Sequence, residues 1–110
     1  MFIVDIYDGQ CLMSDLKIEF SEEDIANLAE KFKILSEPSR LKILRSLYNG
    51  ERNVTSIIEA TGLLQANVSK QLKILEKSEI VACRKSGLQR FYRVIDDKIF
   101  RICASICSSN

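Results

Sequence analysis

The stretch that decides the fold of this 110-residue chain runs Gln65-Ala-Asn-Val-Ser-Lys-Gln-Leu-Lys-Ile-Leu75. Three of its apolar residues, Val68, Leu72 and Leu75, recur at i, i+4 and i+7, which is the spacing of one buried helix face. We therefore predict a helix from about Gln65 to Lys77. Polar and basic side chains are expected on its outer face, where they can bond base edges and phosphates: Gln65, Asn67, Ser69, Lys70, Gln71 and Lys73.

A shorter helix is expected immediately upstream, from about Thr55 to Thr61, with Gly62 ending it. Two helices joined by so short a turn with a glycine predict a helix-turn-helix motif. In that motif the second helix enters the major groove of DNA. The helix over residues 65–77 is therefore the candidate recognition helix.

After the recognition helix the hydrophobic period changes to that of extended chain. Residues 80–84 and 91–95 are predicted to be strands, with residues 85–90 as a turn that contains one glycine. The basic residues of this hairpin predict the cationic wing of a winged helix-turn-helix: Arg84, Lys85 and Arg90. These three and Lys73 are candidate phosphate contacts, and the candidate base-edge contacts are Ser69, Lys70 and Gln71.

Further helices are predicted on both sides of this unit. Ser21 and the acids after it are typical of a helix start, Pro38 fits the first turn of a second helix, and Asp96-Asp97 precedes a last helix. The predicted apolar positions of the first two helices are Ile25, Leu28, Ala29, Phe32 and Leu35, then Leu41, Ile43, Leu44, Leu47 and Tyr48.

The predicted order is α-α-α-α-β-β-α, a mainly α fold with a small β-hairpin. Residues 19–110 are expected to form one DNA-binding and dimerisation domain, and residues 1–18 an N-terminal arm. Met13 is an alternative start, and Cys11 then lies outside the chain.

Composition narrows the possible functions. The chain contains no His, which removes the commonest general base and the commonest metal ligand. With no phosphate-binding glycine loop either, we expect no enzyme. No apolar run approaches the length of a membrane span, and no secretory signal precedes the domain. A cytoplasmic location with reduced thiols is therefore expected.

Charge is distributed unevenly along the chain, although the net charge is only +1. Residues 1–37 hold nine acidic and three basic residues, whereas residues 65–95 hold seven basic and two acidic residues. A basic face on a nearly neutral protein favours a polyanionic partner. Double-stranded DNA is the partner that fits the predicted motif.

Three stretches together resemble the ArsR/SmtB transcriptional repressors: residues 32–44, residues 65–75, and the wing at 84–87 and 91–94. The resemblance covers about residues 20–107. It implies a homodimer formed through the first and last helices, which binds an imperfect inverted repeat and leaves it when an inducer arrives. The last helix favours a dimer independently, because its apolar residues cover more than one stripe. A fuller core within one chain is the competing interpretation.

The resemblance also implies two metal sites, and this chain lacks both. Residues 51–58 hold no thiol where the family has a Cys-Val-Cys type of motif, and the second site requires His. No cofactor is therefore expected to be required.

Cys103 and Cys107 remain as candidate sensing residues, at i, i+4 on one face of the last helix. Two neighbouring thiols suit trivalent arsenic or another soft thiophilic ligand, metals included, or oxidation by peroxide or reactive sulfur. At a dimer interface, a third ligand from the other subunit or from Cys11 is an open alternative. Burial as small apolar side chains is the alternative for both residues. Cys83 is expected to pack within the wing.

Three other functions also fit this sequence. A winged helix can regulate transcription without a small inducer, or can bind protein or RNA instead of duplex DNA. Steeply salt-dependent binding to duplex DNA, with weak binding to single-stranded RNA, would favour a DNA-binding protein over a protein- or RNA-binding one.

Overall fold

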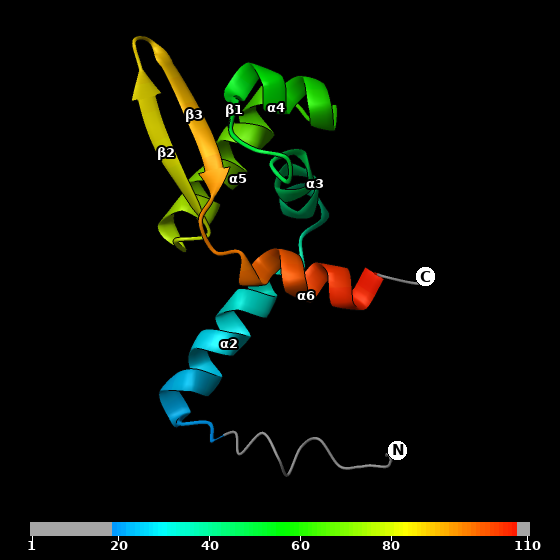
Figure 1. Ribbon diagram of the computed structural model, residues 1–110, viewed down its shortest axis with the longest axis vertical. Helices are drawn as coiled ribbons and strands as arrows, with labels where there is room; N and C mark the ends of the chain where they lie inside the picture. The colour runs from blue at the N-terminus through cyan, green and yellow to red at the C-terminus, as the bar shows by residue number, and fades with distance from the viewer. Residues whose placement is uncertain (1–18, 108–110) are drawn as a thin grey trace. The chain divides into compact units, whose positions relative to one another are not determined.

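Residues 19–107 are described in the computed structural model (Figure 1). The N-terminal arm predicted for residues 1–18, and Cys11 with it, lies outside the described residues. Five helices and three strands follow in the order α2 (Glu22–Leu35), α3 (Pro38–Ser46), β1 (Arg52–Asn53), α4 (Val54–Thr61), α5 (Gln65–Lys77), β2 (Val81–Ser86), β3 (Gln89–Val94) and α6 (Lys98–Cys107). The predicted mainly helical fold with one β-hairpin is confirmed, and β1 is an addition to it.

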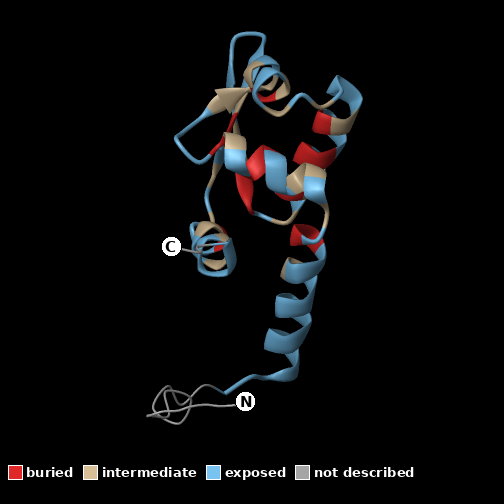
Figure 2. Cartoon of the chain, turned by 90° about the vertical axis from the view of Figure 1, so that its right-hand side faces the viewer, coloured by how far each residue is buried: buried red, intermediate tan, exposed pale blue. Residues whose placement is uncertain are grey.

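The described residues fall into two compact units, residues 19–30 and residues 31–107. In the first unit, the start of α2 has a reciprocal cap. The Ser21 hydroxyl accepts a hydrogen bond from the Asp24 N–H at 3.0 Å, and the Asp24 carboxylate accepts one from the Ser21 N–H at 3.1 Å. This arrangement satisfies two donors at the helix start, which confirms Ser21 as the cap. All described side chains of this unit are exposed (Figure 2).

The second unit contains the helix-turn-helix, and its helices begin and end at recognisable residues. The Glu37 carboxylate caps α3 by accepting a hydrogen bond from the Arg40 N–H, and the Asn53 side chain caps α4 by accepting one from the Ser56 N–H at 2.8 Å. Gly62 ends α4 with a φ of 74°, a left-handed conformation that glycine adopts without strain. The predicted turn between α4 and α5 is thereby confirmed.

The three strands form an antiparallel sheet in the order β1-β3-β2. In the hairpin, Val81 pairs with Val94 and Ser86 pairs with Gln89, so only Gly87 and Leu88 remain as the turn. The six-residue turn predicted for 85–90 was therefore too long. Polar and basic residues suggested a loop there, but an exposed hairpin tolerates such residues on both strands.

The core of the second unit lies among α3, α4, α5 and the base of the sheet, where Figure 2 shows buried residues. The predicted buried face of α5 is confirmed, because Val68, Leu72 and Leu75 are at most 1% exposed. In α3 and the turn after it, Ile43, Leu44 and Leu47 are buried as predicted. Several residues on the predicted apolar faces of α2 and α3 are exposed in the single chain: Ile25, Leu28, Ala29, Phe32, Leu41 and Tyr48.

Asp96 fixes the start of α6. Its carboxylate accepts a hydrogen bond from the Lys31 ammonium at 2.8 Å, and its other oxygen accepts one from the Lys98 N–H at 3.2 Å. The hydrogen bond from Lys31 lowers the pKa of Asp96, against the opposing effect of burial. The ionised form is therefore the one that the folded chain favours.

Replacing Lys31 with methionine is expected to lower the free energy of unfolding at pH 7 by less than about 1 kcal/mol. Because the pKa of Asp96 is lowered on folding, this contribution is present above the unfolded pKa of about 3.9 and is lost as the pH falls through the folded value. Urea unfolding between pH 7 and pH 3 measures it, with Lys33→Met as the matched control on the same helix. A difference between wild type and Lys31→Met that stays constant over this range would contradict the assignment.

Candidate nucleic-acid interface and cysteine pocket

The outer face of α5 carries most of the predicted DNA-contacting residues. Gln65, Ser69, Lys70 and Lys73 are exposed, and Asn67 is half-buried. The described ion pairs include neither of the two lysines. This part of α5 therefore presents hydroxyl, amide and ammonium groups to solvent.

Gln71 was predicted on this face, and the structure corrects that prediction. Its side chain is 5% exposed, because position 71 lies three residues after Val68 and four before Leu75, on the buried side of the helix. The Gln71 amide oxygen accepts a hydrogen bond from the Arg40 guanidinium at 2.8 Å, and its nitrogen donates to the Asn67 side-chain oxygen at 2.9 Å. Gln71 is thus a packing and positioning residue in this structure rather than a surface group.

Gln71 belongs to a polar network that connects α5 with α3 and with the last turn of α2. The side chains of the network are Ser39, Arg40, Asn67 and Gln71. The Asn67 amide donates to the Ser39 hydroxyl at 3.1 Å, and the Arg40 Nε donates to the Ile34 carbonyl oxygen at 2.7 Å, in the last turn of α2. The network therefore orients the half-buried Asn67 against the start of α3. Sequence reasoning missed it because Arg40 and Gln71 are 31 residues apart.

The N-terminus of α5 has a second feature that the sequence analysis did not identify. Leu64 precedes the helix and provides no side-chain hydrogen bond to it. Backbone N–H groups at such a helix start suit a phosphate oxygen. Ala66, exposed in the same first turn, is small enough to allow close approach to bases. The position of Ala66 in the first turn of the predicted recognition helix could have identified it as a residue close to DNA.

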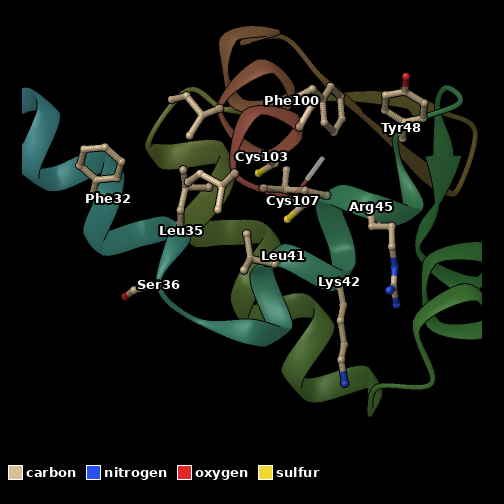
Figure 3. Close-up of a pocket in the computed structure, with 14 residues that line it drawn as sticks. Phe32, Leu35, Ser36, Leu41, Lys42, Arg45, Tyr48, Phe100, Cys103 and Cys107 are labelled. Carbon is tan, nitrogen blue, oxygen red and sulfur yellow. The ribbon is translucent and has the colours of Figure 1, made fainter. Parts of the chain in front are cut away.

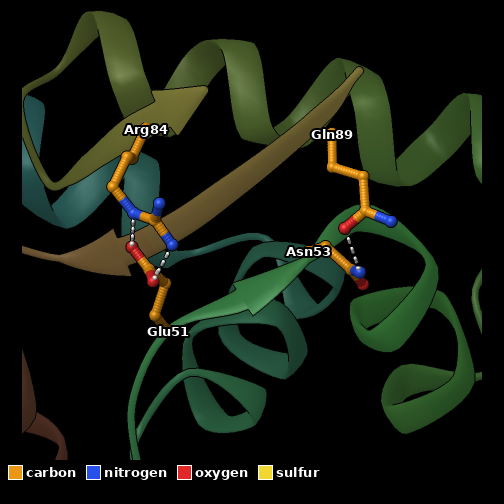
Figure 4. Close-up of polar contacts among 4 residues, drawn as sticks. All are labelled: Glu51, Asn53, Arg84 and Gln89. Atoms are coloured by element: carbon orange, nitrogen blue, oxygen red, sulfur yellow. Dashed lines mark hydrogen bonds and ion pairs between the residues drawn. The ribbon is translucent and has the colours of Figure 1, made fainter. Parts of the chain in front are cut away.

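Arg84, on strand β2 of the wing, forms an ion pair with Glu51. The Arg84 guanidinium donates two hydrogen bonds to the Glu51 carboxylate, at 2.8 and 3.1 Å (Figure 4). Its central carbon lies 4.7 Å from the centre of the Phe91 ring. The hydrogen bond from Arg84 lowers the pKa of Glu51. The contact of Arg84 with phosphate stays a prediction. In this structure two N–H donors of the Arg84 guanidinium are bonded to the Glu51 carboxylate.

A second polar contact attaches the wing beside the first. The Asn53 side-chain nitrogen donates to the Gln89 side-chain oxygen at 3.1 Å (Figure 4). Since the Asn53 side chain also caps α4, this one residue bonds to both the wing and the helix-turn-helix. No local pattern could have predicted either contact, because the partners lie 33 and 36 residues apart in sequence.

Lys85 and Arg90 lie directly opposite each other on β2 and β3. Both are exposed, and neither takes part in an ion pair among the described residues. Like charges that face each other across two strands destabilise a hairpin. An anion bound between the two side chains, such as a DNA phosphate, would relieve this repulsion.

Cys103 is half-buried and Cys107 is exposed, both on α6. Together with the end of α2 and with α3, they line an apolar pocket with a volume of about 710 Å³ (Figure 3). Burial, followed by the neighbouring Cys107, raises the pKa of the Cys103 thiol. The neutral thiol is therefore favoured at Cys103, which also packs against the core.

Metal-binding groups are sparse in the part of the chain that the structure describes. Residues 19–107 contain no cluster of three or more His, Cys, Asp or Glu side chains that could hold a metal ion. Cys83 lies in β2 and packs against the core as predicted. The two cysteines of α6 are thus the only thiols at the pocket among the described residues.

No described helix has both the length and the apolar character that a membrane crossing requires.

Comparison with known proteins agrees with this geometry. The family model of bacterial regulatory proteins, arsR family, matches residues 37–82, which include the helix-turn-helix. An uncharacterized HTH-type transcriptional regulator of Methanocaldococcus jannaschii is 40% identical over 81 residues, which cover 73% of this chain and 91% of that relative.

Solved structures give the same result. The homodimeric winged helix-turn-helix DNA-binding domain of a Mycobacterium bovis protein is 31% identical, with a TM-score of 0.67 over 78% of this chain and 82% of that one. The antimony-specific transcriptional repressor AntR is 26% identical, with a TM-score of 0.76 over 88% of this chain and 91% of that one. The chain therefore belongs to the arsR family of bacterial regulatory proteins, and it is a winged helix-turn-helix transcriptional repressor rather than an enzyme.

Proposed function

We propose that the chain acts as a homodimer on an inverted-repeat operator, and that a thiol-reactive inducer at Cys103 and Cys107 releases it. The observation that carries the DNA part is the set of exposed basic residues without ion-pair partners among the described residues: Lys70, Lys73, Lys85 and Arg90. They come from the recognition helix and the wing, the two elements with which this fold contacts a groove and the adjacent backbone.

Dimerisation is supported by apolar surface that the single chain leaves uncovered. Ile106 on α6 is 75% exposed, and Phe32 near the end of α2 is 50% exposed. An isologous dimer buries such a surface against the same surface of the second subunit. The M. bovis relative is described as homodimeric. Two recognition helices related by a two-fold axis would bind two half-sites in inverted orientation.

The inducer part is supported by the two thiols on one side of α6. They lie at the pocket between α6 and α3, and α3 in turn contacts α5 through the polar network. A change at the pocket can therefore reach the recognition helix through α3. The related AntR is named as antimony-specific, and trivalent antimony and arsenic are both soft centres that thiolates bind.

Fluorescence anisotropy of the reduced protein on a duplex from the DNA upstream of its own gene tests the proposal. Binding should weaken steeply with salt, and arsenite should reverse it. Binding that no thiol reagent affects would leave a DNA-binding regulator without a small inducer. A folded protein that binds no duplex of this region would favour the protein-interaction alternative.

The variant with both Cys103→Ser and Cys107→Ser should bind the duplex like wild type and lose its response. Coupling between inducer and DNA sites changes affinity by about 5- to 150-fold in typical cases, so the wild-type shift should fall in this range. In the double variant it should disappear, because none of the described residues then brings a thiol to the pocket. Cys83→Ser is the matched control and should respond fully. A full response in the double variant would refute sensing at these cysteines.

A further inference from the structure

We propose that Glu51 is a positioning residue for DNA binding, which holds the Arg84 guanidinium so that the free edge of this group binds a DNA phosphate. The inference rests on the proposed function, because it concerns how the wing holds the operator. Three observations carry it: the side of the guanidinium that Glu51 occupies, the support from Phe91, and the face of the wing on which Arg84 lies.

Glu51 occupies only one side of the guanidinium. Arg84 donates to the two carboxylate oxygens from Nε, at 3.1 Å, and from Nη2, at 2.8 Å. The remaining N–H donors, on Nη1 and Nη2, have no acceptor among residues 19–107. Figure 4 shows the second terminal nitrogen directed away from the carboxylate. One N–H of each terminal nitrogen is parallel to the other at this outer edge, which is the fork that binds phosphate oxygens.

Phe91 supports the guanidinium from its flat side. The central carbon of the guanidinium lies 4.7 Å from the centre of the Phe91 ring, and Arg84 and Phe91 are paired across β2 and β3. Glu51 therefore restrains one edge of the guanidinium and Phe91 restrains one face. A free arginine side chain loses much rotamer freedom when it binds a phosphate. Restraining the side chain before DNA arrives removes part of this cost from the binding step.

Arg84 lies on the opposite face of the wing from Lys85 and Arg90. Successive residues of a strand point to opposite faces of the sheet. Lys85 directly follows Arg84 on β2, and its partner Arg90 directly precedes Phe91 on β3. The wing thus has cationic groups on both faces. The phosphate that Arg84 binds is therefore a different one from the phosphate between Lys85 and Arg90.

The alternative is that the Glu51 carboxylate competes with DNA, and that a phosphate must displace it from Arg84. The position of the carboxylate argues against displacement, because the outer edge of the guanidinium stays open. Exposure agrees, since the Glu51 side chain is 29% exposed and the Arg84 side chain 50%, so the carboxylate is the more enclosed partner. As a positioning residue Glu51 strengthens the phosphate contact of Arg84, and as a competitor it weakens that contact.

A double-mutant cycle with Glu51→Gln and Arg84→Ala measures the sign of this effect. Fluorescence anisotropy at 0.15 M salt follows the reduced full-length protein on the duplex from upstream of its own gene. In wild type, Arg84→Ala removes two phosphate contacts per dimer, so binding should weaken about thirtyfold and the slope of log K against log salt should fall by about 1.8. In the Glu51→Gln background Arg84→Ala should cost about fivefold or less, because the guanidinium is no longer held there.

The cycle also removes a confounding effect of charge. Glu51→Gln deletes a negative charge near DNA and strengthens binding in general, but this gain is the same with and without Arg84→Ala and cancels. Lys85→Ala is the matched control, because Lys85 adjoins Arg84 and is exposed. Its cost should agree within about twofold in the two backgrounds. Circular dichroism confirms that every variant is folded at the temperature of the titrations.

The outcomes separate this inference from the proposed function. A cost of Arg84→Ala that is unchanged in the Glu51→Gln background would overturn the positioning role, and a larger cost there would identify Glu51 as a competitor. An equal fall in the cost of Lys85→Ala would mean that Glu51 orients the whole wing, which also overturns a specific role toward Arg84. All three results leave salt-sensitive binding by wild type, and with it the proposed function, intact. A wild-type protein that binds no duplex would refute both.

Discussion

Replacing Lys73 and Lys85 together with alanine is expected to weaken binding to the operator about a thousandfold at 0.15 M salt. Lys73 lies on the outer face of α5 and Lys85 on β2 of the wing, and both are exposed. In a dimer the two substitutions remove four phosphate contacts. Since each contact adds about 0.9 to the slope of log K against log salt, the slope should fall by about 3.6. Anisotropy titrations over a range of salt concentrations measure both quantities.

The matched control is the variant with Lys33→Ala and Lys98→Ala, which changes the net charge equally. Lys33 lies on α2 and Lys98 on α6, and both are exposed and outside the recognition helix and the wing. This control should bind within about twofold of wild type, with the same slope. An equal loss in both double variants would mean that net charge alone attracts DNA. Unchanged binding of the first variant would remove both lysines from the interface.

Patterns within a few residues of one another predicted the elements of this interface well. The spacing of Val68, Leu72 and Leu75 indicated a helix over 65–77, and α5 has those bounds. Gly62 was expected to end the preceding helix, and it does so with a positive φ. Both predictions succeeded because helix periodicity and the conformational freedom of glycine are local properties that the surrounding fold does not alter.

Contacts between distant segments could not be predicted in this way. Gln71 was assigned to the surface because its side chain is polar, although its position in the helix faces inward. The amide is tolerated there because Arg40 and Asn67 satisfy it. Glu51 and Arg84 likewise form their ion pair across 33 residues, and neither residue has a distinctive neighbourhood in the sequence.

Apolar periodicity also fails to say against what a residue is buried. Leu41 and Tyr48 follow the helical pattern, and they are 38% and 67% exposed in the single chain. Both line the pocket that contains the cysteines. The pattern therefore identified apolar residues on the surface of the single chain, and periodicity alone does not separate such a surface from an internal core.

Arg40→Ala is expected to lower the free energy of unfolding by about 2 to 3 kcal/mol, a large part of the stability of a small domain. Arg40 donates to the Ile34 carbonyl oxygen and to the Gln71 side-chain oxygen, both in part-buried positions. Removing the guanidinium leaves both acceptors without this donor. Urea unfolding at one fixed protein concentration measures the loss, because the stability of a dimer depends on concentration.

Arg45→Ala provides the control on the same helix, since Arg45 is exposed and should change stability by no more than about 0.5 kcal/mol. A double-mutant cycle with Gln71→Leu tests the network itself. In the Gln71→Leu background, Arg40→Ala no longer leaves the Gln71 amide without its hydrogen-bond partner. The losses in unfolding free energy of the two single variants should therefore sum to at least about 0.5 kcal/mol more than the loss of the double variant. Strict additivity would mean that Arg40 and Gln71 act separately. In that case the network would not be what holds Asn67 in place beside α3.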